Sequence, residues 1–388
     1  MKFKQLVKSG LVLGLAATLV ACSSDNGTDT PTTNGGSTGG NTDTIVIGSM
    51  GPYEGEYSVY GTAVKNGIDL AIQEFNEGGG KLLDKTVKLV SYDTKGDATE
   101  ATNSYNKLVD SDGAVAIVGA VLSGESTAVG SASQGIGTPI LSPSATALAF
   151  TETGPNVFRG CFTDPIQARM MGEFAVDTLG AKTAAIIYNT GADYSEGLTE
   201  NFKTAFEEKG GKVVEVQGYS NGDKDFNTQL TTIKNANVDV LYIPNYYQDN
   251  ALIAKQARAL GIEATFIGGD GWDGVLSVVE DASAVEGAIF CNHYSPDDEA
   301  IIAWAEAYKA KYGVDATSFS YLGYDCAKLM IQAIQEAGTT DPQAIVDALK
   351  NISFDGVLGH LEFDENGDPI KDLAYITIKD GKYTTYTK

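Results

Sequence analysis

Short apolar runs alternate with amphipathic segments along most of the chain. Runs of about four to eight apolar residues are typical of buried parallel strands, and apolar residues about three or four positions apart are typical of helices. In the first part of the sequence, this pattern predicts strands over 45–50, 86–92 and 114–118 and helices over 61–75 and 98–109. Such a β-α-β-α-β series predicts a parallel sheet with helices on both faces.

The alternation begins again after Arg159 without a long linker. Strands are predicted over 184–188, 212–217, 238–243 and 265–267, and helices over 165–179, 196–209, 226–235 and 249–260. The last third predicts helices over 297–312, 321–337 and 342–349, followed by strands over 359–363 and 374–378. We therefore expect an α/β fold with two doubly wound parallel-sheet lobes.

The amino terminus has a different pattern. Three lysines precede an apolar run over 11–20 that is too short to span a bilayer, and the sequence Leu-Val-Ala-Cys ends it at Cys22. A cysteine after a small residue at this point looks like a bacterial lipobox, which predicts a lipoprotein signal peptide over 1–21 and a lipid on Cys22. The alternative is an ordinary secretory signal with a chance cysteine. Residues 22–44 are rich in Ser, Thr, Gly, Asn and Asp, which is typical of a flexible tether.

Composition excludes several classes of function. The net charge of −24 argues against binding to nucleic acid. The two histidines, His293 and His360, have no second histidine or cysteine at ligand spacing, which argues against a metal site or a Ser-His-Asp triad. The chain has no Walker A sequence, no Gly-x-Gly-x-x-Gly at the first helix and no Gly-x-Ser-x-Gly elbow. We therefore expect no catalysis, no cofactor and no metal.

The cysteines do not form a disulfide framework. With Cys22 lipidated, the odd number of three remains: Cys161, Cys291 and Cys326. Either a bridge between Cys161 and Cys291 or buried free thiols would fit the sequence.

Hydroxyl residues follow two successive strands in the first half. Glycines and Ser123 come after the strand over 114–118, and a second short strand near 140 leads to Ser144 and Thr146. Helix starts at these two points would present free N–H groups and the positive end of the helix dipole, which suit a small carboxylate. The alternative is that these hydroxyls only cap their helices.

A second polar set follows the strands of the second half. The turns after these strands contain Tyr194, Tyr246 and Asp270. Aromatic walls and one carboxylate suit a ligand that carries an ammonium group. Together with the hydroxyls of the first half, they suit a free α-amino acid. Alternatively, Asp270 stabilises its own glycine-rich turn and the tyrosines only pack at loop edges.

Seven short segments, in order along residues 45–388, resemble the leucine/isoleucine/valine-binding proteins of ABC importers. These segments are Gly51-Pro52 with Tyr60-Gly61, Val118-Gly119 with Ser123 and Ser126-Thr127, Ser142-Pro-Ser-Ala-Thr146, Tyr194-Ser-Glu-Gly-Leu198, Lys224-Asp-Phe226, Gln256-Ala-Arg258 with Gly261, and Asp364-Glu-Asn-Gly-Asp368. The resemblance implies the type I periplasmic-binding fold, with two lobes joined by three crossings near 159–162, 290–292 and 372–374. Its N-terminal lobe would comprise 45–160 plus 292–373, and its C-terminal lobe 161–291 plus 374–388.

The resemblance also implies a role for each site residue. Tyr60 and Phe319 would line the pocket for the ligand side chain, and Tyr194 and Tyr246 would close over the ligand. The α-carboxylate would be held by Ser123, the backbone at Ser144 and the hydroxyl of Thr146, and the α-ammonium by Asp270.

Three features depart from the family pattern. Asp270 replaces a longer glutamate, which would draw the ligand deeper or admit a water. Glu125 lengthens the first carboxylate-binding loop by one residue, and the first-lobe disulfide is missing because Lys95 and its neighbours occupy its first half.

The function implied is that of an extracytoplasmic, membrane-anchored lipoprotein of an ABC importer. As a monomer it would bind a free amino acid, branched-chain or otherwise hydrophobic, and deliver it to the permease subunits. The runner-up is a ligand-sensing receptor domain for a small carboxylate or amide. A third option is an enzyme that acts on a bound amino acid. The sequence argues against this option because it offers no plausible general base.

Overall fold

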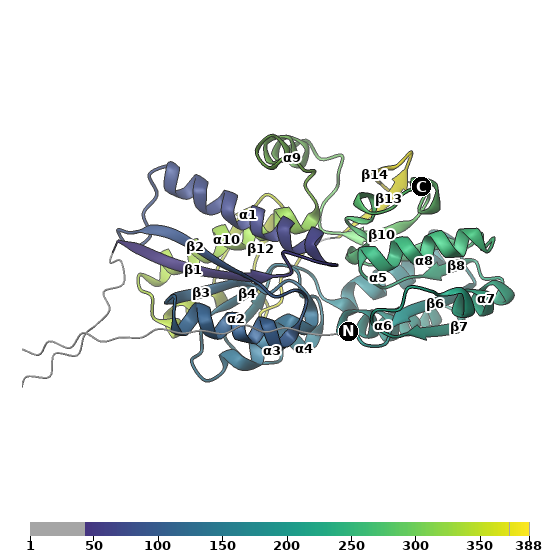
Figure 1. Cartoon of the computed structure of the whole chain (residues 1–388), viewed down its shortest axis with the longest axis horizontal. Helices are drawn as coiled ribbons and strands as arrows, with labels where there is room; N and C mark the ends of the chain where they lie inside the picture. The colour runs from purple at the N-terminus through teal and green to yellow at the C-terminus, as the bar shows by residue number, and fades with distance from the viewer. Residues whose placement is uncertain (1–42, 372, 388) are drawn as a thin grey trace, which may run out of the picture. The chain divides into compact units, whose positions relative to one another are not determined.

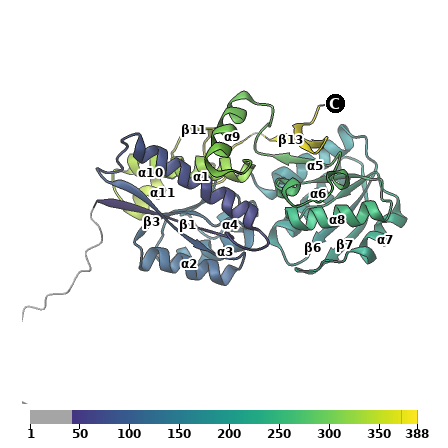
Figure 2. The same ribbon diagram turned by 45° about the horizontal axis from the view of Figure 1, so that its top comes forward.

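Two separate β-sheets, each with its own helices, organise the chain (Figures 1 and 2). The computed structural model describes residues 43–371 and 373–387. The predicted signal peptide, Cys22 and nearly all of the predicted tether lie outside these residues. Among the helices of the described part, none is both long and apolar enough to span a bilayer.

The first sheet has five parallel strands in the order β2-β1-β3-β4-β5. Its strands are β1 (Thr44–Gly51), β2 (Thr86–Asp93), β3 (Ala114–Gly119), β4 (Ile140–Ser142) and β5 (Val157–Arg159). Its helices are α1 (Ser58–Glu77), α2 (Ala98–Asp110), α3 (Ser123–Ser133) and α4 (Leu148–Thr151), joined from the C-terminal third by α10 (Ser318–Ala337) and α11 (Pro342–Lys350). We term this part the first lobe.

Helices cover both faces of the first sheet, as predicted (Figure 1). Helices α1 and α10 pack on one face with Ala116 and Val118 of β3, and α2 and α3 pack on the other face with Ile117. Strand β3 is apolar throughout because both of its faces are buried. Helices α1 and α10 approach closely: a Cβ atom at Gly67 would lie only 2.1 Å from the Ser320 carbonyl oxygen.

The second sheet has seven strands in the order β14-β13-β10-β9-β8-β6-β7, with β13 and β14 antiparallel to their neighbours. Its strands are β6 (Thr183–Asn189), β7 (Lys212–Tyr219), β8 (Val240–Tyr242), β9 (Thr265–Gly268), β10 (Ile289–Asn292), β13 (Ala374–Lys379) and β14 (Lys382–Thr385). Its helices are α5 (Asp164–Asp177), α6 (Asp193–Glu208), α7 (Asn227–Ala236) and α8 (Tyr247–Ala259), with short 3₁₀ turns at η1 (Asp270–Trp272), η2 (Val275–Ser277) and η3 (Ala282–Ala284). We term this part the second lobe.

The chain passes between the two sheets three times. It leaves the first sheet after β5, returns after β10 through α9 (Glu299–Tyr312) to α10, and crosses again before β13. A small hairpin of β11 (Phe354–Gly356) and β12 (Gly359–Leu361) precedes the last crossing. The structure has three free and buried thiols, those of Cys161, Cys291 and Cys326. The predicted alternative of a bridge between Cys161 and Cys291 is therefore not present.

One predicted element is wrong. The residues from Pro143 to Ala147 do not begin a helix but form an irregular loop, and α4 is a four-residue helix that starts only at Leu148. The loop satisfies its backbone in another way, because the guanidinium of Arg159 donates to the carbonyl oxygens of Ala145 and Ala147. The other predicted helix start is present, since α3 begins at Ser123.

Candidate ligand-binding site

A small cavity lies between the two lobes, and seven of the eight predicted site residues line it. Its walls come from α1, the loops after β3 and β4, the start of α3, α6, the residue before α8, η1 and α10. The lining residues are Tyr60, Val121, Leu122, Ser123, Ser144, Tyr194, Tyr246, Asp270, Gly271 and Phe319. Thr146, the eighth predicted residue, is fully buried but does not line the cavity.

Four aromatic rings form the apolar part of the cavity wall. Tyr60 stacks on Phe319 with ring centroids 4.0 Å apart, and Tyr194 stacks on Tyr246 at 4.9 Å. The edge of Tyr246 also meets Tyr60 at 5.8 Å, which joins the two pairs across the lobes. Rings in these positions can bury an apolar side chain of a ligand.

The tyrosine hydroxyls hold the loop that carries Asp270. Tyr60 donates to the carbonyl oxygen of Gly271 (2.6 Å) and accepts from the backbone N–H of Tyr247 (2.9 Å). Tyr194 donates to Oδ1 of Asp270 (2.9 Å) and accepts from the N–H of Gly271 (2.8 Å). The two hydroxyls therefore fix the position of the carboxylate as well as closing the cavity.

The first-lobe wall contains hydroxyls and backbone groups. The hydroxyl of Ser144 donates to the carbonyl oxygen of Val121 (2.8 Å), and the hydroxyl of Ser123 accepts from the N–H of Ala147 (3.4 Å). Neither serine caps a helix, because the N-cap of α3 is Leu122 and Ser144 lies in a loop. The hydroxyl of Thr146 is fully buried and faces the carboxyl of Asp164. Simple helix capping does not account for these residues.

One buried carboxyl group lies next to this wall without lining the cavity. Glu125, in the first turn of α3, accepts from Thr94 and from the N–H of Leu122 (3.3 Å). Burial raises the pKa of Glu125 to about 7. The helix start beside Ser123 is therefore nearly uncharged at mildly acidic pH.

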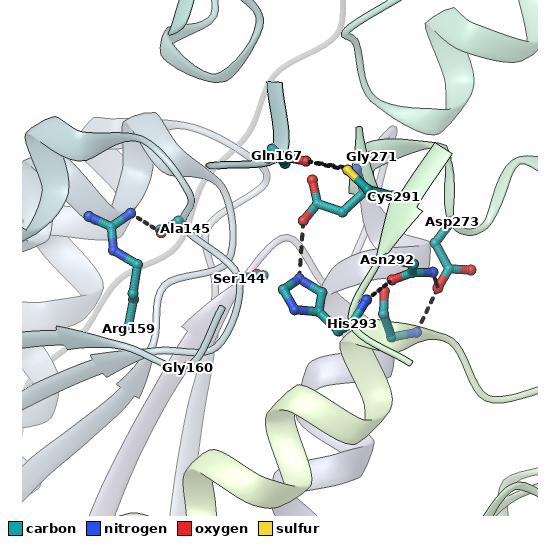
Figure 3. Close-up of polar contacts among 12 residues, drawn as sticks. Ser144, Ala145, Arg159, Gly160, Gln167, Gly271, Asp273, Cys291, Asn292 and His293 are labelled. Carbon is teal, nitrogen blue, oxygen red and sulfur yellow. Dashed lines mark hydrogen bonds and ion pairs between the residues drawn. The ribbon is translucent and has the colours of Figure 1, made fainter. Parts of the chain in front are cut away.

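Arg159 clamps the loop that carries Thr146. Its guanidinium is fully buried and pairs with Asp368 through Nε (2.6 Å). It also donates to the carbonyl oxygen of Ala145 (2.6 Å; Figure 3). A second hydrogen bond goes to the carbonyl oxygen of Ala147 (2.9 Å), on the other side of Thr146. Sequence reasoning treated Arg159 only as a lobe boundary. The sequence feature that could have indicated this role is a charged residue at the end of a short apolar run.

The second-lobe wall is built around the buried Asp270. Nε2 of His293 lies 3.5 Å from Oδ2 of Asp270 (Figure 3). The ring of Phe162 stacks on His293 with centroids 3.7 Å apart. Burial lowers the pKa of His293 to about 4, so the imidazole is neutral at physiological pH. The Asp270 carboxylate makes no hydrogen bond to its own turn; its partner is Tyr194. Stabilisation of its own loop does not account for this aspartate.

Two further buried residues stand behind Asp270. Gln167 accepts from the N–H of Asp270 (3.1 Å) and from the thiol of Cys291 (3.4 Å), and it donates to Asp164 (3.1 Å). Burial raises the pKa of Asp164 to about 8. Sequence reasoning missed Asp164, Gln167 and His293 as members of the site, because only the fold brings them to Asp270.

The described residues hold no group of three or more His, Cys, Asp and Glu side chains that could bind a metal ion. The cavity instead has an apolar aromatic wall, an uncharged hydroxyl wall and a carboxylate. This arrangement suits a small zwitterion with an apolar side chain.

Comparisons with known proteins agree with this geometry. The family model described as "Periplasmic binding protein" matches residues 44–382. The leucine-, isoleucine-, valine-, threonine- and alanine-binding protein of Pseudomonas aeruginosa is 30% identical, over 89% of this chain and 92% of that protein. The Leu/Ile/Val-binding protein BraC3 of Rhizobium johnstonii is 34% identical, over 84% and 88%.

Solved structures give the same result. The leucine-binding protein LivK of Thermotoga maritima is 34% identical with a TM-score of 0.81, covering 88% of this chain and 98% of that one. LivJ of Streptococcus pneumoniae, in complex with isoleucine, is 29% identical with a TM-score of 0.82, covering 89% and 100%. The predicted resemblance and fold are thus confirmed: the chain belongs to the periplasmic binding protein family, with the type I fold and as a relative of the leucine/isoleucine/valine-binding proteins.

Proposed function

We propose that this protein is the extracytoplasmic substrate-binding component of an ABC importer and that it binds a free amino acid with an apolar side chain. The observation that carries the proposal is the cavity between the lobes. Its lining combines a buried carboxylate, Asp270, with the two serines Ser123 and Ser144 and four aromatic rings. The α-ammonium of an amino acid would pair with Asp270, and its α-carboxylate would accept from the hydroxyls. An apolar side chain would pack against the rings.

Each predicted residue has a role in this proposal. Ser123, the Ser144 backbone and Thr146 hold the ligand carboxylate, and Asp270 holds its ammonium. Tyr60, Phe319, Tyr194 and Tyr246 surround its side chain. The names of the relatives support branched-chain ligands, since these proteins are described as binding leucine, isoleucine or valine.

Ligand binding in this proposal stabilises the closed arrangement of the two lobes, which the permease recognises. The lobes are 45–160 plus 292–373 and 161–291 plus 374–388, and the three crossings serve as the hinge. The protein acts as a monomer without chemistry. Cys22 carries a lipid that anchors the protein to the outer face of the cytoplasmic membrane.

A small aromatic carboxylate is the second candidate ligand. A solute-binding protein of R. palustris in complex with benzoate has the same fold, with a TM-score of 0.81 and 24% identity. The aromatic wall would suit such a ring. The buried Asp270 disfavours it, because a ligand without a cationic group leaves that carboxylate unpaired.

A thermal-shift panel distinguishes these ligands. Residues 45–388 are unfolded and refolded to remove carried-over ligand, then mixed with each of the twenty amino acids, benzoate, small carboxylates and amides. We expect leucine, isoleucine or valine to raise the melting temperature, since a ligand at about 100 times its Kd adds about 2.7 kcal/mol. The same panel on Asp270→Ala is the matched control. A response to benzoate alone, or to no amino acid, would contradict the proposal.

A fractionation experiment tests the anchor. The full chain should sediment with membranes and Cys22→Ala should not, because that change removes the only thiol near the predicted cleavage point. Equal distribution of the two proteins would exclude the lipid on Cys22.

A further inference from the structure

A second buried carboxyl group, that of Asp273, directly follows the turn that carries Asp270. Asp273 is fully buried and does not line the cavity. Its Oδ2 accepts from the backbone N–H of Ser318 (2.7 Å) and from Nδ2 of Asn292 (3.0 Å). Figure 3 shows Asp273 beside Asn292. These hydrogen bonds reach elements of both lobes.

Asp273 joins the two lobes at the second crossing. It follows η1 and belongs to the second lobe, whereas Ser318 is the first residue of α10 in the first lobe. Asn292 ends β10, where the chain leaves the second sheet. One side-chain oxygen therefore holds a turn of one lobe, a helix start of the other lobe and the strand at which the chain crosses.

The start of α10 favours a carboxylate as its partner. The first N–H groups of a helix have no partner within the helix, and the positive end of the helix dipole lies there. Burial raises the pKa of Asp273, and its hydrogen bonds to Asn292 and Ser318 counteract part of that rise. The hydroxyl of Ser318 also faces this carboxyl. The second lobe thus supplies the polar partner that the first N–H group of α10 needs.

Both ends of this link lead to the cavity. On the second-lobe side, the N–H of Asp273 donates to the carbonyl oxygen of Asp270 (2.9 Å). On the first-lobe side, Ser318 directly precedes Phe319, whose ring lines the cavity and stacks on Tyr60 with centroids 4.0 Å apart. The link therefore helps to set how far the Phe319 ring stands from the Asp270 turn.

We propose that Asp273 is a positioning residue that makes the site select amino acids by the size of their side chain. By holding the start of α10 from the opposite lobe, it fixes the Phe319 ring against the side chain of the bound amino acid. A large apolar side chain packs against this ring, whereas alanine has only a methyl group to place there. The inference rests on the proposed function, since it requires an amino acid between the lobes.

The test is the ratio of the leucine and alanine affinities, because these two ligands share both charged groups and differ only in the side chain. Calorimetry measures each Kd for the unsubstituted protein and for Asp273→Asn. The matched control is Asp341→Asn, because Asp341 caps α11 of the first lobe through the N–H of Ala344 (3.0 Å) and does not line the cavity. We expect Asp273→Asn to reduce the preference for leucine over alanine by at least about fivefold and Asp341→Asn to leave it unchanged.

A purely structural role of Asp273 gives a different result. A lower melting temperature with an unchanged affinity ratio would show that Asp273 only caps α10, and would overturn the inference. The double variant Asp273→Asn/Phe319→Ala should have the same ratio as Phe319→Ala alone, since Asp273 acts through this ring. A further change of the ratio in the double variant would also overturn it.

A second variant carries the test if Asp273→Asn does not fold. Ser318→Pro removes the N–H that donates to Asp273, and proline is well tolerated at the first position of a helix. It should reduce the preference for leucine as well, and an unchanged ratio would overturn the inference. Absence of binding of any amino acid to the unsubstituted protein would instead overturn the proposed function, and with it this inference.

Discussion

The first-lobe wall of the cavity is made of hydroxyls and backbone groups, whereas the second-lobe wall carries buried charge. Ser123, Ser144 and Thr146 follow two neighbouring strands of one sheet. Asp270 instead depends on Tyr194 and Gln167, which come from two other helices. The uncharged wall is assembled locally, at the ends of adjacent parallel strands. The charged wall needs a network that spans the lobe.

The difference follows from the cost of burying charge. An uncharged hydroxyl can be buried with one hydrogen bond, but a buried carboxylate needs several donors or a cation. The second lobe therefore surrounds Asp270 with the hydroxyl of Tyr194 and the neutral His293. The variants below test this division between the two walls.

The largest effect is expected from the charged wall. Asp270→Ala should weaken leucine binding by more than about a hundredfold, because loss of one partner of a buried charge pair costs about 3–5 kcal/mol. Calorimetry measures the affinity, and the exposed Asp225→Ala is the control. An unchanged Kd would mean that the ammonium is not bound by Asp270.

The next largest effect concerns Glu125, the buried acid next to the first-lobe wall. The pKa of Glu125 is about 7 in the folded protein, against an ordinary value of 4.5, so the folded state holds this proton more tightly than the unfolded chain does. Its contribution to stability is therefore present at low pH and is lost as the pH rises from 4.5 to about 7.

Glu125→Gln should remove this pH dependence. Between pH 5 and pH 8, the unfolding free energy of the unsubstituted protein should fall by more than that of Glu125→Gln, with a difference of up to about 3 kcal/mol. Urea unfolding at both pH values gives the comparison. Other buried acids, such as Asp164, act equally in both proteins. Parallel pH profiles would show that Glu125 ionises normally.

Thr146→Val tests the hydroxyl wall itself. It should weaken leucine binding by about 1–3 kcal/mol, since the valine leaves an acceptor or donor of the ligand unpaired. The shape is nearly retained, so the melting temperature of the empty protein should change little. If the affinity is unchanged, Thr146 is only part of the loop held by Arg159.

The smallest effect is expected at the rim, outside both walls. Lys224 of the second lobe pairs with Glu56 of the first lobe (2.5 Å), and both side chains are partly exposed. Lys224→Met should weaken leucine binding by at most about 1 kcal/mol, because exposed ion pairs are weak. About 1 M salt should remove the difference between the two proteins. A loss as large as that of Thr146→Val would make this pair part of the closing mechanism.

Most of the fold could be predicted from the sequence because both sheets bury both faces. The predicted helix over 61–75 is α1 (Ser58–Glu77), and the predicted strand over 114–118 is β3. The sequence analysis does not predict the short strands β5 and β10. Their three and four residues are too few to show the alternation of a strand, and they lie where crossings between the lobes were expected. The hydroxyls of the loop after β4 are typical of helix starts, so the sequence predicts a helix there that the structure does not have.

Local sequence patterns specify the alternation of strands and helices, and with it the polar residues at the ends of the strands. Those features are local, since they depend on residues a few positions apart. Which distant side chains complete the site depends on the packing of the folded chain. Gln167 and Asp270 are 103 positions apart, and Arg159 and Asp368 are 209 apart. No local pattern encodes such contacts, because they exist only once the sheets and their crossings have brought the strand ends together.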